Sequence, residues 1–399
     1  MNKHFGVALA IVPLLTLLFA GGVPTHAREL NGRSYDENGM NSPHVFAQGW
    51  AQVNTSGFGT VGNTMISALD VFDGQMYATT WNEAGAQVWR SSNGRAWSQF
   101  IPPAPFATTM IYDARDFGSY LYIGTLRETG GGEIWRTDGT TWERVATGGL
   151  GDANNVAFAA FGVLSNNLYV ATANLVTGVE IWRSSTGDAG SWTQVNADGF
   201  GGGATWDGIT FSGAFNGYLY VGLGRKVGAD GSIAELWRSD NGTNWTPVFT
   251  NGLGDPNNSY VTAFASTSPG LFIGLRNTTT GGQLWRSANG TTFSPVVTNG
   301  HNNPKNARPY GLLIHANDLY IVYSNWVTGA EVWKSHAPPA EDERIAEGGW
   351  GDPNNKNADY FDKAAVSFNG SLYIGTGNDV TGGQIWQMLH SVYLPLVVR

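Results

Sequence analysis

The sequence predicts an all-β protein, a seven-bladed β-propeller of four-stranded antiparallel blades. The main observation is a phrase that returns in seven versions, the clearest being Thr-Gly-Val-Glu-Ile-Trp-Arg-Ser at 177–184. Its tryptophan recurs every 46 to 55 residues, at Trp89, Trp135, Trp182, Trp237, Trp285, Trp333 and Trp386. A period of this length, with strand-like segments inside it, is typical of β-propellers.

Each repeat contains four segments that indicate strands. The first is an apolar or alternating run, such as residues 156–161. The second is a Leu-Tyr-like phrase, found at 76–77, 121–122, 168–169, 219–220, 271–272, 319–320 and 372–373. The third is the tryptophan phrase. The fourth follows an Asn-Gly or Asp-Gly turn, a strong hairpin signal, and opens with an aromatic residue: Trp97, Trp142, Trp192, Trp245 or Phe293.

The two ends of the repeat region predict how the ring closes. The seventh repeat ends after its third strand at Trp386, so it lacks a fourth strand. Residues 50–54, Trp-Ala-Gln-Val-Asn, are similar to residues 192–196, Trp-Thr-Gln-Val-Asn, at a fourth strand. We therefore expect the N-terminal segment to complete the last blade. In the sixth repeat, residues 336–342 replace the tight turn, but the strand at 343–345 is expected to remain.

Composition limits the possible classes of protein. Glycine is abundant, with 55 residues, and charged residues make up only 13% of the chain. This mixture suits short strands joined by tight turns. A net charge of −9, without clustered Lys or Arg, argues against nucleic acid as a partner. The chain has no cysteine, so packing must hold the fold without disulfides. No segment after residue 27 is apolar for long enough to span a membrane.

The N-terminus has the features of a secretory signal peptide. Lys3 is followed by an apolar run at 7–20 and by Thr25-His26-Ala27, a small-residue cleavage site. We expect a protein that is secreted or held at the cell surface, and export without cysteine favours a bacterial origin. The expected parts are a signal peptide at 1–27, a linker at 28–45, the propeller at 46–389 and a C-terminal tail at 390–399.

The turns before the fourth strands resemble a known motif. Residues 91–97 (Ser-Ser-Asn-Gly-Arg-Ala-Trp), 239–245 and 287–293 resemble the Asp-box, or BNR repeat, of sialidases and related propellers. The resemblance implies that the polar side chain of each box ties the hairpin backbone and that its aromatic residue packs between sheets. It also implies that the boxes lie on the face opposite the ligand site.

Sialidase activity would imply three arginines around a carboxylate, a Tyr/Glu nucleophile pair and an acidic Asp. The Arg-Ile-Pro-like phrase of that family is absent from this chain. The arginines that would have to converge are Arg127, Arg225 and Arg308.

Antiparallel strand order predicts which loops share a face of the ring. The loops that join the second and third strands of a blade lie with the loops between blades. We call this the top face, and the box turns lie on the other one. Three tryptophans fall in top-face loops outside the repeat pattern: Trp81, Trp206 and Trp326. An exposed indole suits a sugar ring, because it offers an apolar face and an N–H donor. The alternative is that these residues cover the central channel or pack on neighbouring loops.

Two positions recur around the predicted ring. The turn after the second strand holds Trp81, Arg127, Asn174, Arg225, Asn277, Asn325 and Asn378. Asparagine suits such a turn because it accepts left-handed angles and bonds its own backbone, whereas Arg127 and Arg225 are candidate contacts to an anion or a sugar. Two residues before the repeated tryptophan, every repeat has Glu or Gln, which favours a structural role over the paired-acid chemistry of glycosidases.

Oxygen-rich loops between the blades repeat Gly-Asp-x-Asn-Asn, at 151–155, 254–258 and 351–355. Such loops form Asx turns, and they can also bind calcium, which is the one cofactor considered. The acids to test for catalysis are Asp70, Asp113, Asp207, Asp359 and Asp362. No Ser/His/Asp order, zinc spacing or phosphate loop is recognisable.

These observations predict a secreted, monomeric, non-catalytic propeller that binds a glycan or another extracellular or cell-surface partner through its top face. Propellers host enzymes, lectins and scaffolds alike. Two alternatives therefore stay open, a sialidase-like glycoside hydrolase or lyase and a structural extracellular scaffold. No catalytic or metal-binding residue is assigned. The candidate ligand-binding residues are Trp81, Arg127, Trp206, Arg225, Trp326 and Arg308.

Overall fold

The structure of the chain is a computed structural model. It describes residues 45–46, 49–100, 106, 108–204, 209–211, 214–228, 231–267, 270–336, 342–356 and 365–389. Residues 1–42 lie outside the described residues, which all fall within the unit Pro43–Arg399. The expected signal peptide and C-terminal tail also lie outside them, as does Trp206. No helix in the described part is long and apolar enough to cross a membrane.

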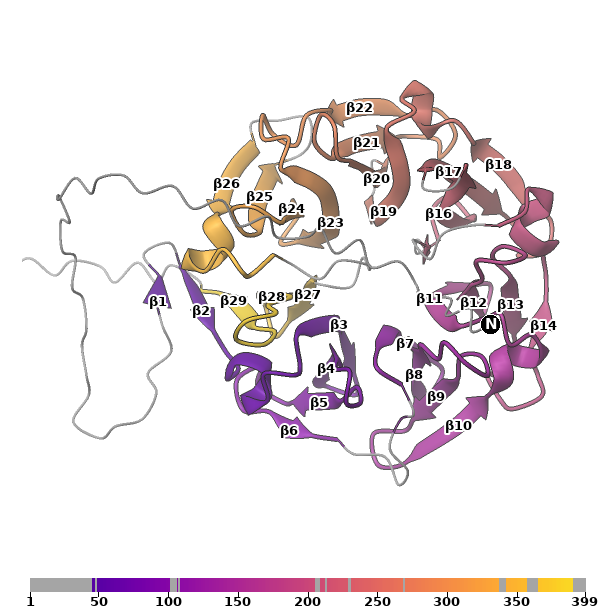
Figure 1. The fold of residues 1–399 in the computed structure, drawn as a ribbon, viewed down its shortest axis with the longest axis horizontal. Helices are drawn as coiled ribbons and strands as arrows, with labels where there is room; N and C mark the ends of the chain where they lie inside the picture. The colour runs from indigo at the N-terminus through magenta and orange to yellow at the C-terminus, as the bar shows by residue number, and fades with distance from the viewer. Residues whose placement is uncertain are drawn as a thin grey trace, which may run out of the picture. The chain divides into compact units, whose positions relative to one another are not determined.

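The described residues form seven antiparallel sheets, so the expected seven-bladed β-propeller is confirmed (Figure 1). Blade 1 is β3 (Met65–Phe72), β4 (Gln75–Trp81), β5 (Val88–Ser91) and β6 (Ser98–Gln99). Blade 2 is β7 (Ile111–Phe117), β8 (Tyr120–Thr125), β9 (Ile134–Thr137) and β10 (Trp142–Ala146). Blade 3 is β11 (Ala157–Leu164), β12 (Asn167–Ala173), β13 (Ile181–Ser184) and β14 (Thr193–Gln194).

The later blades repeat this order. Blade 4 is β15 (Thr210–Phe211), β16 (Leu219–Val227), β17 (Gly231–Ser239) and β18 (Thr246–Phe249). Blade 5 is β19 (Asn258–Thr267), β20 (Gly270–Asn277), β21 (Gln283–Ser287) and β22 (Ser294–Val297). Blade 6 is β23 (Asn306–His315), β24 (Asp318–Asn325), β25 (Glu331–His336) and β26 (Asp342–Ala346), so its fourth strand remains, as expected.

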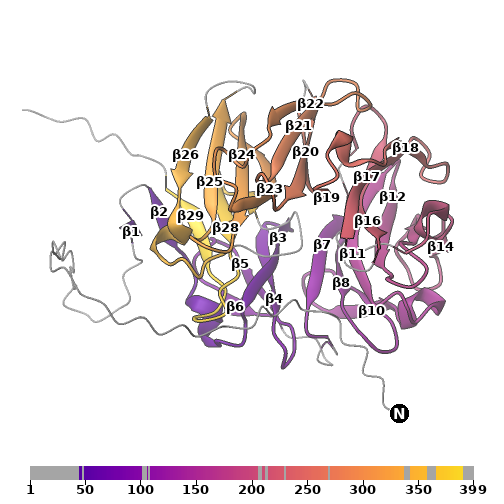
Figure 2. The same cartoon turned by 45° about the horizontal axis from the view of Figure 1, so that its top comes forward.

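Blade 7 combines strands from both ends of the folded chain. Its members are β27 (Ala365–Phe368), β28 (Ser371–Gly375), β29 (Ile385–Met388), β2 (Trp50–Gln52) and β1 (Val45–Phe46). Strand β2 pairs antiparallel with β29, with Trp50 opposite Met388 and Gln52 opposite Trp386. In Figures 1 and 2 the indigo β2 lies beside the yellow β29. The N-terminal strand therefore closes the ring through hydrogen bonds, as the sequence predicts.

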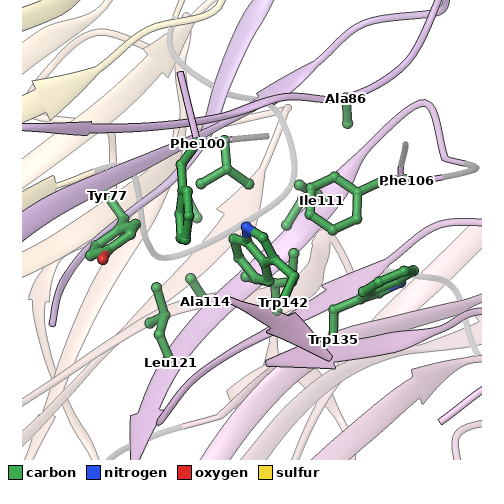
Figure 3. Packing of buried hydrophobic residues seen from close by; sticks show 12 residues of the cluster. Tyr77, Ala86, Phe100, Phe106, Ile111, Ala114, Leu121, Trp135 and Trp142 are labelled. Atoms are coloured by element: carbon green, nitrogen blue, oxygen red, sulfur yellow. The ribbon is translucent and has the colours of Figure 1, made fainter. Parts of the chain in front are cut away.

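The blades are apolar on both faces because each packs against two neighbours. One core cluster joins blades 1 and 2 and includes Tyr77, Phe100, Phe106, Trp135 and Trp142. Figure 3 shows Phe100 and Phe106 on either side of the Trp142 ring, with ring centroids 5.2 and 5.3 Å from it. The aromatic residue that opens a fourth strand therefore packs between sheets.

The box turns are held by their polar side chains. Asn241 Oδ1 accepts the backbone N–H groups of Thr243 (2.9 Å) and Asn244 (2.8 Å). Asn93, Asp138 and Asn289 make the same pair of bonds in their hairpins. The glycine beside Asn241 has φ +72°, and a Cβ on it would overlap the Tyr169 hydroxyl of the preceding blade. Gly94 and Gly290 meet a tyrosine in the same way, whereas Gly139 has φ +89° without that overlap, so every one of these turns uses glycine for its backbone and three of them also for the close approach of a tyrosine.

The loops between blades pass through left-handed backbone at a bulky residue. Phe58, Leu150, Phe200, Leu253 and Trp350 have φ between 53° and 59°, a strained conformation for such residues. They lie in the short turns η1 (Ser56–Gly59), η2 (Gly148–Gly151), η3 (Asp198–Gly201), η4 (Gly252–Gly254) and η5 (Gly348–Gly351). Ring stacking offsets the strain, since Trp350 stacks on Trp386 at 5.4 Å. Trp350 is therefore a packing residue, as expected.

Candidate functional site

Two classes of loop form the top face, as expected from strand order. The turn at 378–382 joins the second and third strands of blade 7, and the loop at 57–63 leads from blade 7 to blade 1. The two lie against each other, because Gly57 N donates to Gly383 O (2.8 Å) and Gly383 N donates to Asn63 O (2.8 Å). A ligand on the top face would therefore meet both kinds of loop.

Four asparagines hold the top-face turns, which confirms their expected role. Asn174 Oδ1 accepts the backbone N–H groups of Val176 (3.0 Å) and Thr177 (2.9 Å), and its Nδ2 donates to Asn155 Oδ1 (3.0 Å). The equivalent bonds are made by Asn277, Asn325 and Asn378. Each buried amide therefore ties its turn to the neighbouring loop between blades.

The ring of Glu and Gln residues serves the blades in the same way. Glu180 Oε2 accepts the indole N–H of Trp182 (2.9 Å) and the side-chain amide of Asn155 (2.7 Å). The other six members also accept the indole N–H of the tryptophan two residues later. Burial raises the pKa of Glu180, although these two hydrogen bonds oppose the shift. The position is structural, as expected.

Arg127 and Arg225 are joined to this ring. Arg127 bonds Glu133 Oε1 at 2.6 Å. Arg225 forms a bidentate pair with Glu235 (3.1 and 2.9 Å) and also donates to the carbonyl oxygens of Gly199 and Gly203 (both 2.7 Å). In these two blades an arginine bonds the buried carboxylate, as an asparagine of the loop between blades does for Glu180. These contacts give both arginines a structural role, and their contact with a ligand stays a prediction.

Trp81 and Arg308 border one apolar cluster on the inner strands. Trp81 is half-buried against the cluster of Met65, Met110, Tyr112 and Tyr310, and its indole N–H donates to Glu83 (2.9 Å). The Arg308 guanidinium lies 5.8 Å from the centre of the Tyr310 ring. Trp81 thus has packing contacts, in line with the alternative that these tryptophans pack on neighbouring residues. Arg308 lies beside Tyr310, a ring of the same cluster.

Trp326 is the candidate that presents an open aromatic surface. Its side chain is 48% exposed and follows Asn325 in a top-face turn of blade 6. The Lys356 ammonium lies 5.4 Å from the centre of the indole ring. All the exposed large apolar side chains of the described residues lie at the top face: Val227 ends strand β16, and the others, Val61, Val176, Trp326, Val327 and Val380, lie in top-face loops.

Sequence reasoning missed Lys356, which is a neighbour of Trp326 only in space. Its nitrogen is 3.9 Å from Asp379 Oδ2, a carboxylate in the next top-face turn. A signal exists in the repeats, because the residue after the Asn-Asn pair is Val156, Ser259 and then Lys356. Lysine is the one charged residue at that position of the three loops.

Blade 6 holds a second polar cluster that sequence reasoning missed. His301 occupies the loop position that holds Phe58 or Trp350 elsewhere, and its ring stacks on Trp333 at 4.1 Å. Its Nε2 lies 2.7 Å from Asp342 Oδ2, and its Nδ1 lies 3.1 Å from the Tyr323 hydroxyl. Burial raises the pKa of Tyr323. The cluster ties a loop between blades to the fourth strand of blade 6.

The acids and oxygen-rich loops form local bonds. Asp113 accepts the backbone N–H groups of Ala114 (2.8 Å) and Phe161 (2.7 Å) and so links blades 2 and 3. Asp152 accepts the backbone N–H and the side-chain amide of Asn154, and the backbone bond makes an Asx turn. Asp152 also accepts the side-chain amide of Asn174. Within the described residues, no three His, Asp or Glu side chains gather as a metal site. Asp70 accepts the backbone N–H of Val71 (2.8 Å), and the other three candidate acids, Asp207, Asp359 and Asp362, lie outside the described residues.

Comparison with known proteins shows the fold and no family. No family model matches the chain, and no curated protein does. A chain of a mitotic checkpoint complex matches 95% of this chain over its whole length, at 13% identity and a TM-score of 0.54. At this sequence identity the match shows a shared fold only.

Other solved structures match at lower scores. A Trypanosoma rangeli sialidase in complex with sialic acid has 12% identity, covers 86% of this chain and has a TM-score of 0.43. An Aleuria aurantia lectin in complex with Fucα1-6GlcNAc has 12% identity, covers 71% of this chain and 95% of its own, and has a TM-score of 0.43. This chain spans 55% of the sialidase chain and 41% of a prolyl endopeptidase chain that it also matches.

Proposed function

We propose that this chain is an exported, non-catalytic propeller that binds a glycan, in the extracellular medium or on a cell surface, through its top face. The observation that supports the proposal is the gathering of exposed apolar side chains, Trp326 among them, on that one face. A single exposed apolar residue needs no explanation. Here every exposed large apolar side chain of the described residues lies on the same face of the ring, which supports a role for that face in binding. A half-exposed indole adds a flat apolar platform of the kind that sugar rings contact.

The charges on the described part of the top face favour binding over catalysis. Arg127 and Arg225, which a sialidase-like site would need, are engaged with Glu133 and Glu235. These pairs leave no described arginine cluster ready to hold a substrate carboxylate. The sialidase-like hydrolase or lyase remains the alternative, and a structural scaffold is the third candidate.

A glycan array with the mature protein tests the proposal. We expect glycan binding that Trp326→Ala reduces by about tenfold or more, because one lost aromatic contact is worth ~1–2 kcal/mol. Leu175→Ala is the matched control, since Leu175 holds the equivalent position in blade 3. Binding that EDTA abolishes would make calcium a cofactor. Glycan cleavage would favour the hydrolase, and an absence of binding and cleavage would favour the scaffold.

The proposal includes export as a monomer. N-terminal sequencing of protein recovered from the medium or cell surface checks the first part, and a mature chain beginning near Arg28 is the expected result. Light scattering on the purified protein checks the monomeric state, and the expected mass is somewhat below the 42.7 kDa of the full chain. A retained N-terminus or a dimer mass would contradict the corresponding part.

A further inference from the structure

Three top-face segments are joined by hydrogen bonds and form a seam between blades 6 and 7. They are the turn at 325–329, the loop at 348–356 and the turn at 378–382. Ala330 N donates to Asn355 O (2.8 Å), and Lys356 N donates to Gly377 O (3.0 Å). Asn378 Nδ2 donates to Asp352 Oδ2 (2.9 Å). These bonds fix the backbones that carry Trp326, Lys356 and Asp379.

The Lys356 ammonium is held beside the indole and retains unused donors. It lies 5.4 Å from the centre of the Trp326 ring, within the range of a cation–π contact. Its distance of 3.9 Å to Asp379 Oδ2 is too long for a hydrogen bond. This nitrogen donates no hydrogen bond to any other described residue. An ammonium group has three donors, so an incoming oxygen anion can bind here.

Three other cations of the described top face are already paired. Arg127 and Arg225 bond Glu133 and Glu235, and the Arg344 guanidinium lies 2.6 Å from Glu347. The carboxylate beside Lys356 differs from the buried Glu133 and Glu235, because the Asp379 side chain is 68% exposed and therefore largely hydrated. A ligand anion can replace Asp379 as the partner of Lys356 without leaving a buried charge behind.

We propose that this seam is a subsite for an anionic sugar, and the proposal rests on the glycan-binding function above. The apolar C–H face of the pyranose packs on Trp326, and its carboxylate or sulfate group pairs with Lys356. The exposed Val327 and Val380 flank the site and extend its apolar surface. Asp379 opposes the ligand charge, so it weakens binding of anionic sugars and leaves neutral ones unaffected.

The test uses three probes of one size: tetragalacturonate, its methyl ester and a sulfated neutral tetrasaccharide. Affinities are measured by calorimetry on the full mature protein at low and high salt. We expect an anionic probe to bind about tenfold more tightly than the ester, with a preference that falls as salt rises. Whichever anionic probe binds better identifies the charged group.

Three variants separate the contributions. Lys356→Gln is expected to remove the anionic preference and to leave ester binding within about twofold. Asp379→Asn is expected to raise anionic affinity about two- to fivefold, and Trp326→Ala to weaken all three probes. Lys305→Gln, which removes an exposed lysine from another top-face loop, is the matched control and should change little.

The outcomes distinguish this subsite from the function on which it rests. Equal binding of acid and ester, both lost in Trp326→Ala, would overturn the anionic subsite and leave glycan binding intact. An anionic preference that survives Lys356→Gln would also overturn it. Failure of every probe and of the glycan array would remove both proposals.

Discussion

At the scale of single residues, Glu and Gln share one position in seven blades, and they differ there by a charge. Gln87, Gln283 and Gln384 accept the indole N–H as well as the glutamates do, so the bond needs no charge. Glu235 has an arginine partner, whereas the hydrogen bonds of Glu180 come from an amide and an indole. The charge of Glu180 is therefore a liability for the fold.

We predict that Glu180→Gln stabilises the protein at neutral pH by about 0.5–1 kcal/mol. Burial raises the pKa of Glu180, so its contribution is favourable below its unfolded-state pKa and is lost as pH rises through the folded-state pKa. The stabilisation by Glu180→Gln should therefore become smaller as pH is lowered to about 4, where the Glu180 side chain of the wild type is mostly protonated. Urea unfolding at both pH values measures this.

The matched variant Glu235→Gln should act in the opposite direction. It removes the carboxylate that neutralises the Arg225 guanidinium, at a site where the arginine side chain is only 11% exposed. We expect a loss of about 2–3 kcal/mol. Equal effects of the two substitutions would contradict the distinction between a paired and an unpaired carboxylate.

A second prediction concerns two turn glycines, and it separates the cost of a positive φ from the cost of a steric overlap. Gly74 and Gly242 have similar φ values, +68° and +72°, but a Cβ on Gly74 meets open space and one on Gly242 meets the Tyr169 hydroxyl. Gly74→Ala should cost about 1 kcal/mol, and Gly242→Ala at least about 3 kcal/mol. Melting temperatures compare them, and equal losses would mean that the tyrosine contact is unimportant.

At the scale of one element, blade 6 replaces an apolar contact with a polar one. His301 stacks on Trp333 as Phe58 stacks on Trp89, but its nitrogens also reach Asp342 and Tyr323. Burial alone would raise the pKa of Asp342, yet the hydrogen bond and charge of His301 lower the pKa overall. The pair therefore stabilises the fold above the unfolded-state pKa of Asp342.

We predict that His301→Phe keeps the stacked ring and still destabilises the protein at pH 7 by about 1–3 kcal/mol, because Asp342 loses its partner. Since the pKa of Asp342 is lowered, the stability that the pair supplies is lost as pH falls through the folded-state pKa. The difference in the free energy of unfolding between variant and wild type should accordingly become smaller below about pH 4. Thermal unfolding across this range measures it, and a constant difference would contradict the role of Asp342.

At the scale of the whole molecule, the ring depends on a short segment from the other end of the chain. Trp50 is buried and donates its indole N–H to Ile345 O (3.1 Å) in blade 6, while β2 pairs with β29 in blade 7. Deleting residues 46–56 should lower the melting temperature of the whole ring. Trp50→Ala should cost about 3–5 kcal/mol. Deleting 28–42 is the control, and a wild-type melting temperature after the 46–56 deletion would refute the closure.

The repeats made the architecture predictable, because each tryptophan phrase and each Asn-Gly turn specifies a local strand or hairpin. The closure followed from the likeness of residues 50–54 to residues 192–196. The contacts of Lys356 and His301 were not predictable in this way. Each depends on a partner in another loop or strand, Trp326 and Asp342, at a distance that the repeat period does not encode. The bond between Arg225 and Glu235 is different, because both residues lie in one hairpin of blade 4, at two repeat positions that are visible in the sequence.

The contact between a strand-two tyrosine and the next box glycine has a consequence for inserting new sequence into this chain. Blade 5 has Phe272 where Tyr169 and Tyr220 stand in other blades, and the following turn has lost its Asn-Gly pair. Hydroxyl and glycine are thus absent together, as expected if the glycine is needed to leave room for the hydroxyl. The joint between blades 5 and 6 therefore carries no glycine requirement, so a peptide tag at 337–341 should be tolerated where one at 241–244 would not be.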